Sequence, residues 1–460
     1  MDRRSFLQSA AIAGLISGEK TAAAWSTKLA ASRAEEWKLD VVLYDRSGWA
    51  ALAYLPPIQR ENGEILVGFD AQNEGALTDD FYTAHSEWIF VSSCSGAKSW
   101  RQIPSHSAEL NPYRNAQFAT AWPVRLPDGT LINVIDNMLT LQEQKQRLDT
   151  LGIGDLWHPD SRFDWDLWPA SFAERLKAEG LMVFDKQGPW LPAGVVATHA
   201  RPLVVAVSSD GGATWKTKPI EGLPEFSRVV GWFRRGVVLP DGTVLGPIYG
   251  QIKGEGSRRS WDSDGTYILR SEDRGNSWRL ITLAYDPSGK QGFNETDLFL
   301  LPNGRILAMI RNDGEGARLY QSYSDDGGRT WTPPVPTKIP GSPAHVTSLR
   351  SGNLLCTYRY EGYNGYRAVL SWDKGKSWDL DNEKILLDDL LPGSLGYPTS
   401  MQLNDGTIFT LYNGVKPGPP RPGDQRTYKS VLSLQPPLHS YLAGSIYTEN
   451  FVKPLGISGK

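Results

Sequence analysis

The sequence predicts an all-β fold, a six-bladed β-propeller, from two turn motifs that alternate along the chain. The first motif reads Ser-x-Asp-x-Gly-x-(Ser/Thr)-Trp, and we call it the Asp box. Four good copies and one degenerate copy occur, over residues 93–100, 208–215, 271–278, 324–331 and 371–378. The second motif is a turn dipeptide between apolar runs, and its copies begin at Asn62, Asp128, Asp241, Asn303, Ser351 and Asp405. Each of the first five dipeptides precedes one Asp box, so six hairpin units follow one another.

Each Asp box predicts a tight turn that is plugged against a neighbouring sheet. The Asp side chain can accept hydrogen bonds from amides of its own turn, the Gly permits a positive φ, and the Trp supplies apolar surface. The degenerate copy has Ser95 in the place of Asp and Ala97 in the place of Gly. Since each hairpin unit makes one small antiparallel sheet, six units predict six blades.

The composition fits a turn-rich all-β protein and excludes several classes of function. The chain has 460 residues, with 40% hydrophobic residues, 17 Trp, 18 Tyr and 46 Gly. Its net charge of −3 provides no electrostatic attraction to nucleic acid or to an anionic membrane surface. The two cysteines, Cys94 and Cys356, belong to different blades, so no disulfide framework is expected. The six His are dispersed and no phosphate-binding glycine loop is present, so we expect no metal and no cofactor.

Residues 1–24 are similar to a bacterial twin-arginine export signal. Paired arginines, Arg3 and Arg4, precede a mildly apolar run over residues 9–18 and an Ala-x-Ala site before Trp25. The apolar run is too short to span a bilayer, so we expect no membrane insertion. The interpretation is therefore a periplasmic or secreted protein whose propeller occupies residues 25–460.

The Asp boxes and hairpins together resemble the sialidase (neuraminidase) superfamily of Asp-box β-propellers, over nearly all of the chain after the leader. The motif is more specific for the fold than for the activity, because Asp boxes also occur in non-catalytic sugar-binding proteins and sorting receptors. The resemblance implies a nucleophilic Tyr, a Glu that takes its proton, an acid/base Asp and three arginines that hold a substrate carboxylate.

In the first blade, the resemblance implies an Arg at a position where this chain has Leu55. Arg46 or Arg60 could compensate for this loss. The loop that follows contains Asp79 and Asp80, and the resemblance implies an acid/base Asp in a comparable loop. We take Asp80 as the candidate, and two solvated loop carboxylates are the alternative.

The second blade is predicted to carry an insertion at about 137–195, between its hairpin and its Asp box. The insertion is rich in Trp, which can stack on sugar rings or form a small core of its own, and both interpretations stay open. His199, which follows the insertion, is a reserve candidate for the base of a lyase.

The fourth blade carries the sharpest pair of candidate residues, Glu295 and Arg311. Glu295 starts one strand of a hairpin and Arg311 ends the next, so antiparallel pairing brings both to the same end of the blade. The resemblance implies a functional Glu and a carboxylate-binding Arg at this spacing, whereas a structural ion pair is the alternative.

The last two blades complete the candidate site. Arg359 ends its strand in the fifth blade as Arg311 does in the fourth, and it is our candidate for a second anion-binding arginine; Arg367 is the runner-up. The same blade contains His345, a further reserve base. In the sixth blade, Tyr397 precedes the hairpin where the resemblance implies the nucleophile. A neutral Tyr avoids the repulsion that an anionic nucleophile would meet at a carbon bearing a carboxylate.

The sequence thus predicts an exported sialidase-like glycoside hydrolase that acts on an anionic glycan. Catalytic Tyr397, Glu295 and Asp80 would act together with substrate-binding Arg311 and Arg359 or Arg367. A polysaccharide lyase acting on uronate glycans and a non-catalytic glycan-binding propeller are the alternatives. We expect a monomer whose partner is the glycan, and a closing strand formed by or paired with residues 432–451.

Overall fold

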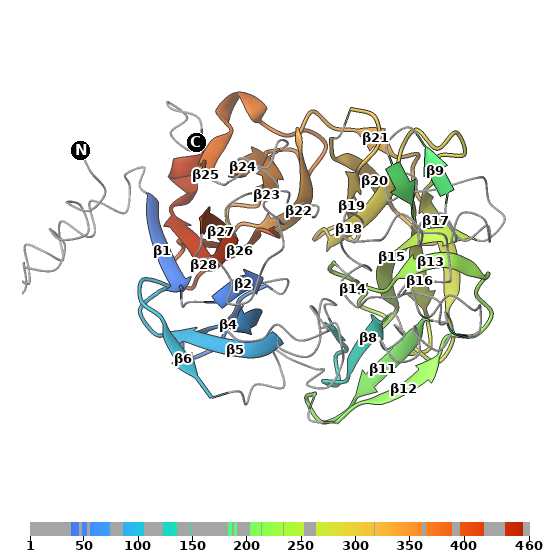
Figure 1. Cartoon of the computed structure of the whole chain (residues 1–460), viewed down its shortest axis with the longest axis horizontal. Coiled ribbons are helices and arrows are strands. Elements are labelled where there is room, and N and C mark those ends of the chain that lie inside the picture. Colours follow the sequence, from blue (N-terminus) through green and yellow to red (C-terminus); the bar gives the residue numbers. More distant parts are fainter. Residues whose placement is uncertain are drawn as a thin grey trace, which may run out of the picture.

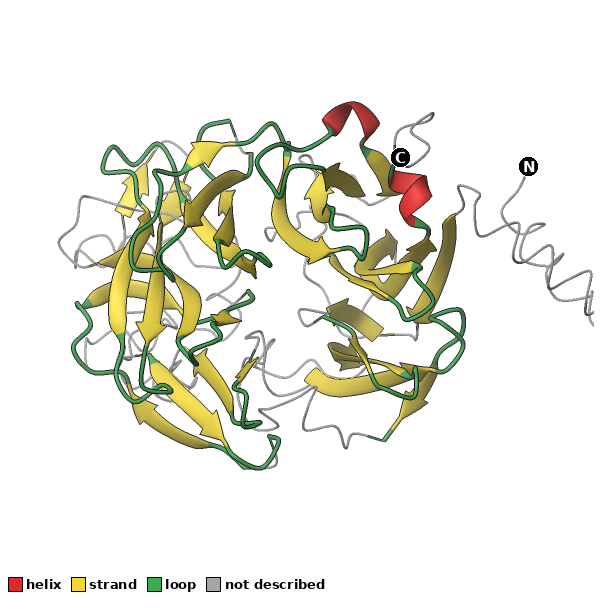
Figure 2. Cartoon of the chain, turned by 180° about the vertical axis from the view of Figure 1, so that it is seen from behind, coloured by secondary structure: helices red, strands yellow, loops and turns green. Residues whose placement is uncertain are grey.

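The chain forms a ring of antiparallel sheets around a central axis (Figure 1), as seen in a computed structural model. The structure describes residues 38–45, 48–52, 56–73, 86–104, 123–135, 149, 183–185, 188–190, 203–252 except 213 and 233, 264–360 except 317, 365–388, 396–417 and 438–453. Strands are the main secondary structure of the described part of the chain and are joined by loops and turns (Figure 2), with short helical segments at η5 (Leu380–Asn382) and α5 (Glu449–Val452).

The first three blades follow one another along the chain. Blade 1 has the order β2-β4-β5-β6, with β3 paired to β4, blade 2 has the order β7-β8-β11-β12, and blade 3 has the order β13-β15-β16-β17, with β14 paired to β15. Their bounds are β2 (Gly48–Leu52), β3 (Ile58–Gln59), β4 (Ile65–Asn73), β5 (Ser86–Ser93), β6 (Arg101–Ile103), β7 (Val124–Arg125), β8 (Leu131–Ile135), β11 (Val204–Ser208), β12 (Lys216–Pro219), β13 (Phe226–Val230), β14 (Val237–Val238), β15 (Val244–Ile252), β16 (Gly265–Ser271) and β17 (Arg279–Ala284). In blade 2, β8 pairs directly with β11, and the segment between them contains the separate hairpin β9 (Val183–Asp185) and β10 (Gly188–Trp190).

The last three blades include the strand that closes the ring. Blade 4 has the order β18-β19-β20-β21, blade 5 has the order β22-β23-β24-β25, and blade 6 has the order β26-β27-β28-β1. Their bounds are β18 (Phe293–Leu300), β19 (Ile306–Asn312), β20 (Tyr320–Ser324), β21 (Val335–Pro336), β22 (Gly341–Ser348), β23 (Leu354–Tyr360), β24 (Tyr366–Ser371), β25 (Lys384–Leu387), β26 (Thr399–Gln402), β27 (Ile408–Pro417), β28 (Leu438–Tyr447) and β1 (Lys38–Tyr44). The six-bladed propeller predicted from the two turn motifs is therefore confirmed.

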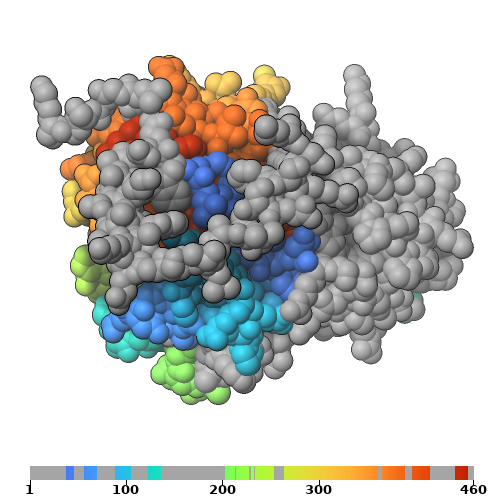
Figure 3. Space-filling model, turned by 90° about the vertical axis from the view of Figure 1, so that its left-hand side faces the viewer, coloured from blue at the N-terminus to red at the C-terminus, as the bar shows by residue number. Residues whose placement is uncertain are grey.

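Closure of the ring joins the two ends of the described chain. β28 pairs antiparallel with β1 from Lys38↔Tyr447 onward, which matches the prediction that residues 432–451 would contribute or pair with a closing strand. On the flank shown in Figure 3, blue residues from the N-terminal part lie beside red and orange residues from the C-terminal part. The rings of Tyr44 and Phe69, 5.0 Å apart between centroids, continue this packing from blade 6 into blade 1.

The core lies between neighbouring blades, because each sheet buries side chains against the next one. One cluster, for example, joins Ile65, Val67 and Phe69 of blade 1 to Phe409 and Leu411 of blade 6. The Asp-box Trp residues extend these clusters toward the preceding blade. The Trp100 ring lies 5.4 Å from that of Phe409, and Trp378 packs on the cluster between blades 4 and 5.

The Asp boxes have the hydrogen bonds that their sequence predicts. In the copy beginning at Ser208, the Thr214 amide and hydroxyl donate to the two carboxylate oxygens of Asp210 at 2.9 and 2.6 Å, and the Trp215 indole donates to the Gly212 carbonyl at 3.0 Å. In the degenerate copy, the Ser95 hydroxyl oxygen takes the carboxylate's role and accepts from the Ser99 amide at 2.9 Å.

Strand register places both turn motifs at one face of the propeller. Ser324, where an Asp box begins, lies opposite Ile306, next to the Asn303 hairpin turn. Tyr320, at the other end of the same strand, lies opposite Ile310, one residue before Arg311. The ends of the strands that carry Arg311 and Glu295 therefore form the face opposite to the Asp boxes.

Candidate active site

Three of the predicted residues meet at the face opposite the Asp boxes. The Tyr397 hydroxyl donates a hydrogen bond to Glu295 Oε1 at 2.9 Å, across 102 residues of chain. Arg311 Nη1 donates to the other carboxylate oxygen, Glu295 Oε2, at 2.5 Å, and Arg311 Nε donates to Asp313 Oδ1 at 2.8 Å. Tyr397 and Glu295 are each 7% exposed, so the couple is nearly closed to solvent.

The local backbone explains how Glu295 reaches this position. β18 and β19 pair at Asn294↔Arg311 and again at Asp297↔Met309, so Glu295 and Thr296 together face one residue of the neighbouring strand. This is a β-bulge, which bends the strand and redirects a side chain. Glu295 also has a φ of 27°, a left-handed value that is strained for a residue with a side chain.

Arg359 is buried beside the same couple. It is 1% exposed, near the end of β23, and its charge acts on the Tyr397 hydroxyl. Burial raises the pKa of Tyr397 well above its ordinary value, and the Glu295 charge raises it further, while Arg311 and Arg359 oppose both effects. The Tyr397 hydroxyl is thus neutral at ordinary pH and is hydrogen-bonded to a proton acceptor.

Two arginines that the sequence interpretation missed lie under this couple. Arg234 is 1% exposed, its guanidinium lies 5.7 Å from the centre of the Tyr397 ring, and it donates to the Ala344 carbonyl at 2.6 Å. Its neighbour Arg235 forms an ion pair of 2.7 Å with Asp297, which is fully buried. The signal in the sequence was an adjacent Arg-Arg pair just before the Asp241 hairpin, on the inner edge of blade 3.

Arg367 and His345 lie in other surroundings. Arg367 Nη2 forms an ion pair with Asp388 at 2.7 Å, and Arg367 Nη1 donates to the Leu387 carbonyl at 3.0 Å, so it is bound to the outer strand of blade 5. His345 Nδ1 accepts from the Ser400 amide at 3.0 Å. Burial, together with the Arg235 and Arg234 charges, lowers the pKa of His345 well below its ordinary value.

Several predicted positions lie outside the described residues, and the roles assigned to them from the sequence remain predictions. These are Leu55, Asp79, Asp80, Arg46 and His199.

Arg60 is described, in the hairpin turn of blade 1, where it pairs with Glu64 at 3.1 Å. This turn lies at the Asp-box face, so Arg60 does not compensate for Leu55. In the described part of the chain, no group of three or more His, Cys, Asp or Glu side chains is arranged to hold a metal ion. Among the described helices, none has the length and apolarity needed to cross a membrane.

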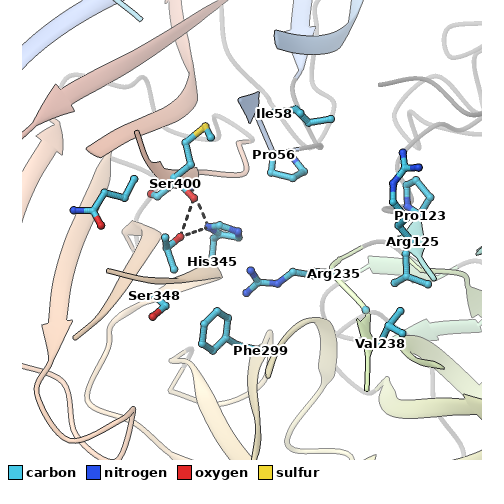
Figure 4. A pocket seen from close by; sticks show the side chains of 15 residues that line it. Pro56, Ile58, Pro123, Arg125, Arg235, Val238, Phe299, His345, Ser348 and Ser400 are labelled. Atoms are coloured by element: carbon cyan, nitrogen blue, oxygen red, sulfur yellow. Dashed lines mark hydrogen bonds between the residues drawn. The ribbon is translucent and has the colours of Figure 1, made fainter. Parts of the chain in front are cut away.

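A cavity of about 520 Å³ lies on the propeller axis (Figure 4). Every blade contributes to its lining, with Ile58, Arg125, Arg235, Phe299, His345 and Met401 as examples from blades 1 to 6. The cavity is separate from the Tyr397–Glu295 couple, because none of Tyr397, Glu295, Arg311 and Arg359 lines it.

Comparisons with known proteins agree with this architecture. The family of BNR repeat-like domains matches residues 172–410, which is more than half of the chain. A sialidase from Paraclostridium sordellii is 26% identical over 274 residues, covering 53% of this chain and 64% of that protein. A sialidase from Micromonospora viridifaciens is 28% identical over 243 residues, covering 48% of this chain and 34% of that protein. The chain therefore spans less than two thirds of the length of either relative.

A solved structure shows the same fold. A protein of unknown function from Dyadobacter fermentans superposes with a TM-score of 0.57 at 20% sequence identity, covering 90% of this chain and 99% of that chain.

Proposed function

Because the chain belongs to the family of BNR repeat-like domains, within the sialidase superfamily, we propose that it is an exported glycoside hydrolase that cleaves an anionic glycan. The substrate would carry a carboxylate close to the scissile bond, as sialic-acid-like and uronate sugars do. Two curated relatives are named sialidases, which supports the class of reaction but not the identity of the sugar.

One observation carries the proposal, the buried hydrogen bond of 2.9 Å between the Tyr397 hydroxyl and Glu295. A neutral phenol next to a carboxylate can attack a carbon that bears a negative group, because the nucleophile becomes charged only as it loses its proton. Arg311 holds the second Glu295 oxygen at 2.5 Å and so orients the carboxylate toward the phenol.

The chemistry follows in two steps. In the first, Tyr397 Oη bonds to the anomeric carbon, Glu295 takes the phenol proton, and the glycosidic C–O bond breaks as its oxygen receives a proton from Asp80. In the second, water attacks the same carbon and the bond between that carbon and Tyr397 Oη breaks, while Asp80 takes a proton from the water and Glu295 returns its proton to the Tyr397 oxygen. Two displacements at one carbon predict retention of the anomeric configuration.

The arginines would hold the substrate carboxylate. Arg311 and Arg359 come from adjacent blades and lie beside the Tyr397–Glu295 couple, Arg359 buried and Arg311 with 14% of its side chain exposed. A planar guanidinium can bind a carboxylate through two hydrogen bonds, which a point charge cannot do. With Leu55 where the resemblance implies a third arginine, we expect weak or absent cleavage of ordinary sialosides.

The same substitution, Leu55, favours a second candidate function, a lyase acting on uronate glycans, because such an enzyme needs fewer arginines. The base would then be Tyr397 after Glu295 has taken its proton, or His199, which lies outside the described residues. His345 is less suited, because its Nδ1 accepts from the Ser400 amide and burial together with the Arg235 and Arg234 charges lowers its pKa.

The test is a screen of sialosides and uronate glycans that follows both new reducing ends and the absorbance of unsaturated products. On the active glycan, Tyr397→Phe should lower kcat by about 10²–10⁴-fold or more, because the attacking oxygen is lost while the ring is kept. Tyr323→Phe is the matched control, since it removes a phenol hydroxyl that donates to the Gly375 carbonyl at 2.7 Å on the Asp-box face. Full activity of Tyr397→Phe would refute the nucleophile, and an unsaturated product would favour the lyase.

Export is the last part of the proposal and rests on residues 1–24, which lie outside the described residues. Replacement of both Arg3 and Arg4 by Lys should keep the protein in the cytoplasm with its leader uncut. Cell fractionation measures this, and normal export of the double variant would refute twin-arginine targeting.

A further inference from the structure

The cavity on the propeller axis lies toward the Asp-box end of the inner strands. Phe299, which lines it, pairs with Leu307 close to the hairpin turn after β18, whereas Glu295 lies near the start of that strand. In blade 6, Met401 follows Tyr397 by four residues and pairs with Phe409. The candidate active site and the cavity therefore occupy successive levels of the same axis.

Arg235 is held rigidly at the wall of this cavity. Its Nε donates to the Leu298 carbonyl at 2.9 Å, and its Nη2 donates to Asp297 Oδ2 at 2.7 Å and to the Val346 carbonyl at 2.8 Å. Its guanidinium lies 5.0 Å from the centre of the Phe299 ring. Within the described part of the chain these bonds use Nε and Nη2, so Nη1 keeps its donors for a ligand, and Figure 4 shows the guanidinium extending between the blades.

Among the described residues that line the cavity, the charged side chains are the two arginines Arg125 and Arg235. Asp297 is the carboxylate paired with Arg235, and it interacts electrostatically with Arg234 as well, which in turn also interacts with Glu295. Arg125 adds a third cation at the wall, and among the described residues no Asp or Glu lines the cavity. An anion placed here would meet the Arg235 and Arg125 charges in a partly enclosed space, where electrostatic interactions are stronger than in water.

The rest of the lining is largely apolar. Ile58, Val238, Phe299 and Met401 face the cavity from four different blades. A volume of about 520 Å³ lies within the usual range for ligand sites, which combine mostly apolar walls with a few fixed polar groups.

We propose that the axial cavity is a second ligand site, for a small organic carboxylate. The carboxylate would accept hydrogen bonds from Arg235 Nη1, and the apolar body of the ligand would pack against Phe299, Val238 and Met401. This site goes beyond the proposed hydrolase, because it uses none of the residues assigned to that reaction.

The probes are 4-(trifluoromethyl)benzoate, its neutral amide and trifluoroacetate, titrated into the full chain and followed by ¹⁹F NMR. The benzoate should bind about tenfold or more tightly than the amide, because a hydrogen bond between two charged groups is stronger than one to a neutral acceptor. It should also bind more tightly than trifluoroacetate, which lacks the apolar ring. Equal binding of benzoate and amide, or no binding of either, would overturn the proposal.

Three variants locate the binding. Val238→Phe fills the cavity without changing a charge and should abolish binding. The double variant Arg235→Gln with Asp297→Asn removes the ion pair without leaving a buried carboxylate alone, and should abolish the preference for benzoate over the amide. Arg311→Met should leave binding unchanged, because Arg311 belongs to the candidate active site. If Arg311→Met abolishes binding while Val238→Phe keeps it, the probe occupies the active site and the second site is refuted.

Discussion

At the scale of single residues, Glu295 concentrates the features expected of a functional group. Its backbone has a φ of 27°, it sits in a β-bulge, and its two oxygens are bound by a phenol at 2.9 Å and a guanidinium at 2.5 Å. Strained backbone of this kind costs about 1–3 kcal/mol and persists where the surroundings hold it. The carboxylate is thereby aimed at one proton, that of Tyr397, before any substrate binds.

Arg311→Lys tests the arginine's geometry separately from its charge. The guanidinium binds Glu295 through Nη1 and Asp313 through Nε, two directions that a single ammonium group cannot reproduce. We expect the KM for the active anionic glycan to rise about tenfold or more, with little change for a neutral glycan. Arg318→Lys, at an exposed position of the same blade, is the control. An unchanged KM would show that Arg311 does not bind the anion.

At the scale of structural elements, the bulge of blade 4 has a counterpart in blade 5. β22 and β23 pair at Gly341↔Tyr360 and again at Ala344↔Tyr358, so the extra residues of β22 lie opposite Arg359. In blade 4 the strand β18 is thus bulged next to Arg311, near the end of β19. In blade 5 the strand β22 is bulged next to Arg359, near the end of β23. A bulge bends a strand without disturbing the hairpin turn, so the two blades keep their Asp-box ends regular while their other ends are adapted.

The Asp box predicts a specific dependence of stability on pH. The Thr214 hydroxyl and amide and the Ser208 hydroxyl hold the pKa of Asp210 at about 2, below its ordinary 3.8. A lowered folded-state pKa stabilises the fold above the ordinary value, and this contribution is lost as the pH falls toward about 2. Asp210→Asn should therefore destabilise the protein at pH 7, and the difference from wild type should shrink as the pH falls from about 5 toward 3.

Urea unfolding at a series of pH values measures this difference. Asp381→Asn, at an exposed position in η5, is the control and should not change the unfolding midpoint. A difference between wild type and Asp210→Asn that stays constant down to pH 3 would contradict the role of the ionised carboxylate.

At the scale of the whole molecule, the propeller depends on one non-local pairing, that of β1 with β28. β1 is the outermost strand of blade 6, and the other strands of that blade come from the C-terminal end of the chain. Leu43 of β1 is 8% exposed and packs in the cluster shared by blades 1 and 6. The strand therefore contributes to both the sheet and the core at the seam of the ring.

Leu43→Ala tests the energetic importance of this seam. Truncation of a buried Leu leaves a cavity and costs about 2–5 kcal/mol, so the free energy of unfolding should fall by an amount in this range. The neighbouring residue on the same strand, Val42, is 56% exposed, and Val42→Ala should change the stability by no more than about 0.5 kcal/mol. Denaturant unfolding compares the two variants. If both lose the same free energy of unfolding, burial of Leu43 in β1 does not stabilise the closure of the ring.

The sequence by itself determined the features that depend on neighbouring residues. Turn dipeptides and Asp boxes specify local backbone geometry, so counting them yielded six blades. The pairing of Glu295 with Arg311 was predictable for the same reason, because two strands joined by a short turn have a defined register.

Only the tertiary structure decided the features that depend on residues far apart in the chain. The Tyr397–Glu295 hydrogen bond joins residues 102 positions apart in the chain. Local sequence patterns do not specify how blades 4 and 6 are oriented toward the axis. The same holds for Arg234 under the Tyr397 ring and for Arg367, whose partner Asp388 lies on the outer side of its blade. Ring closure places these side chains, because each blade's position is set by packing against its two neighbours rather than by its own sequence.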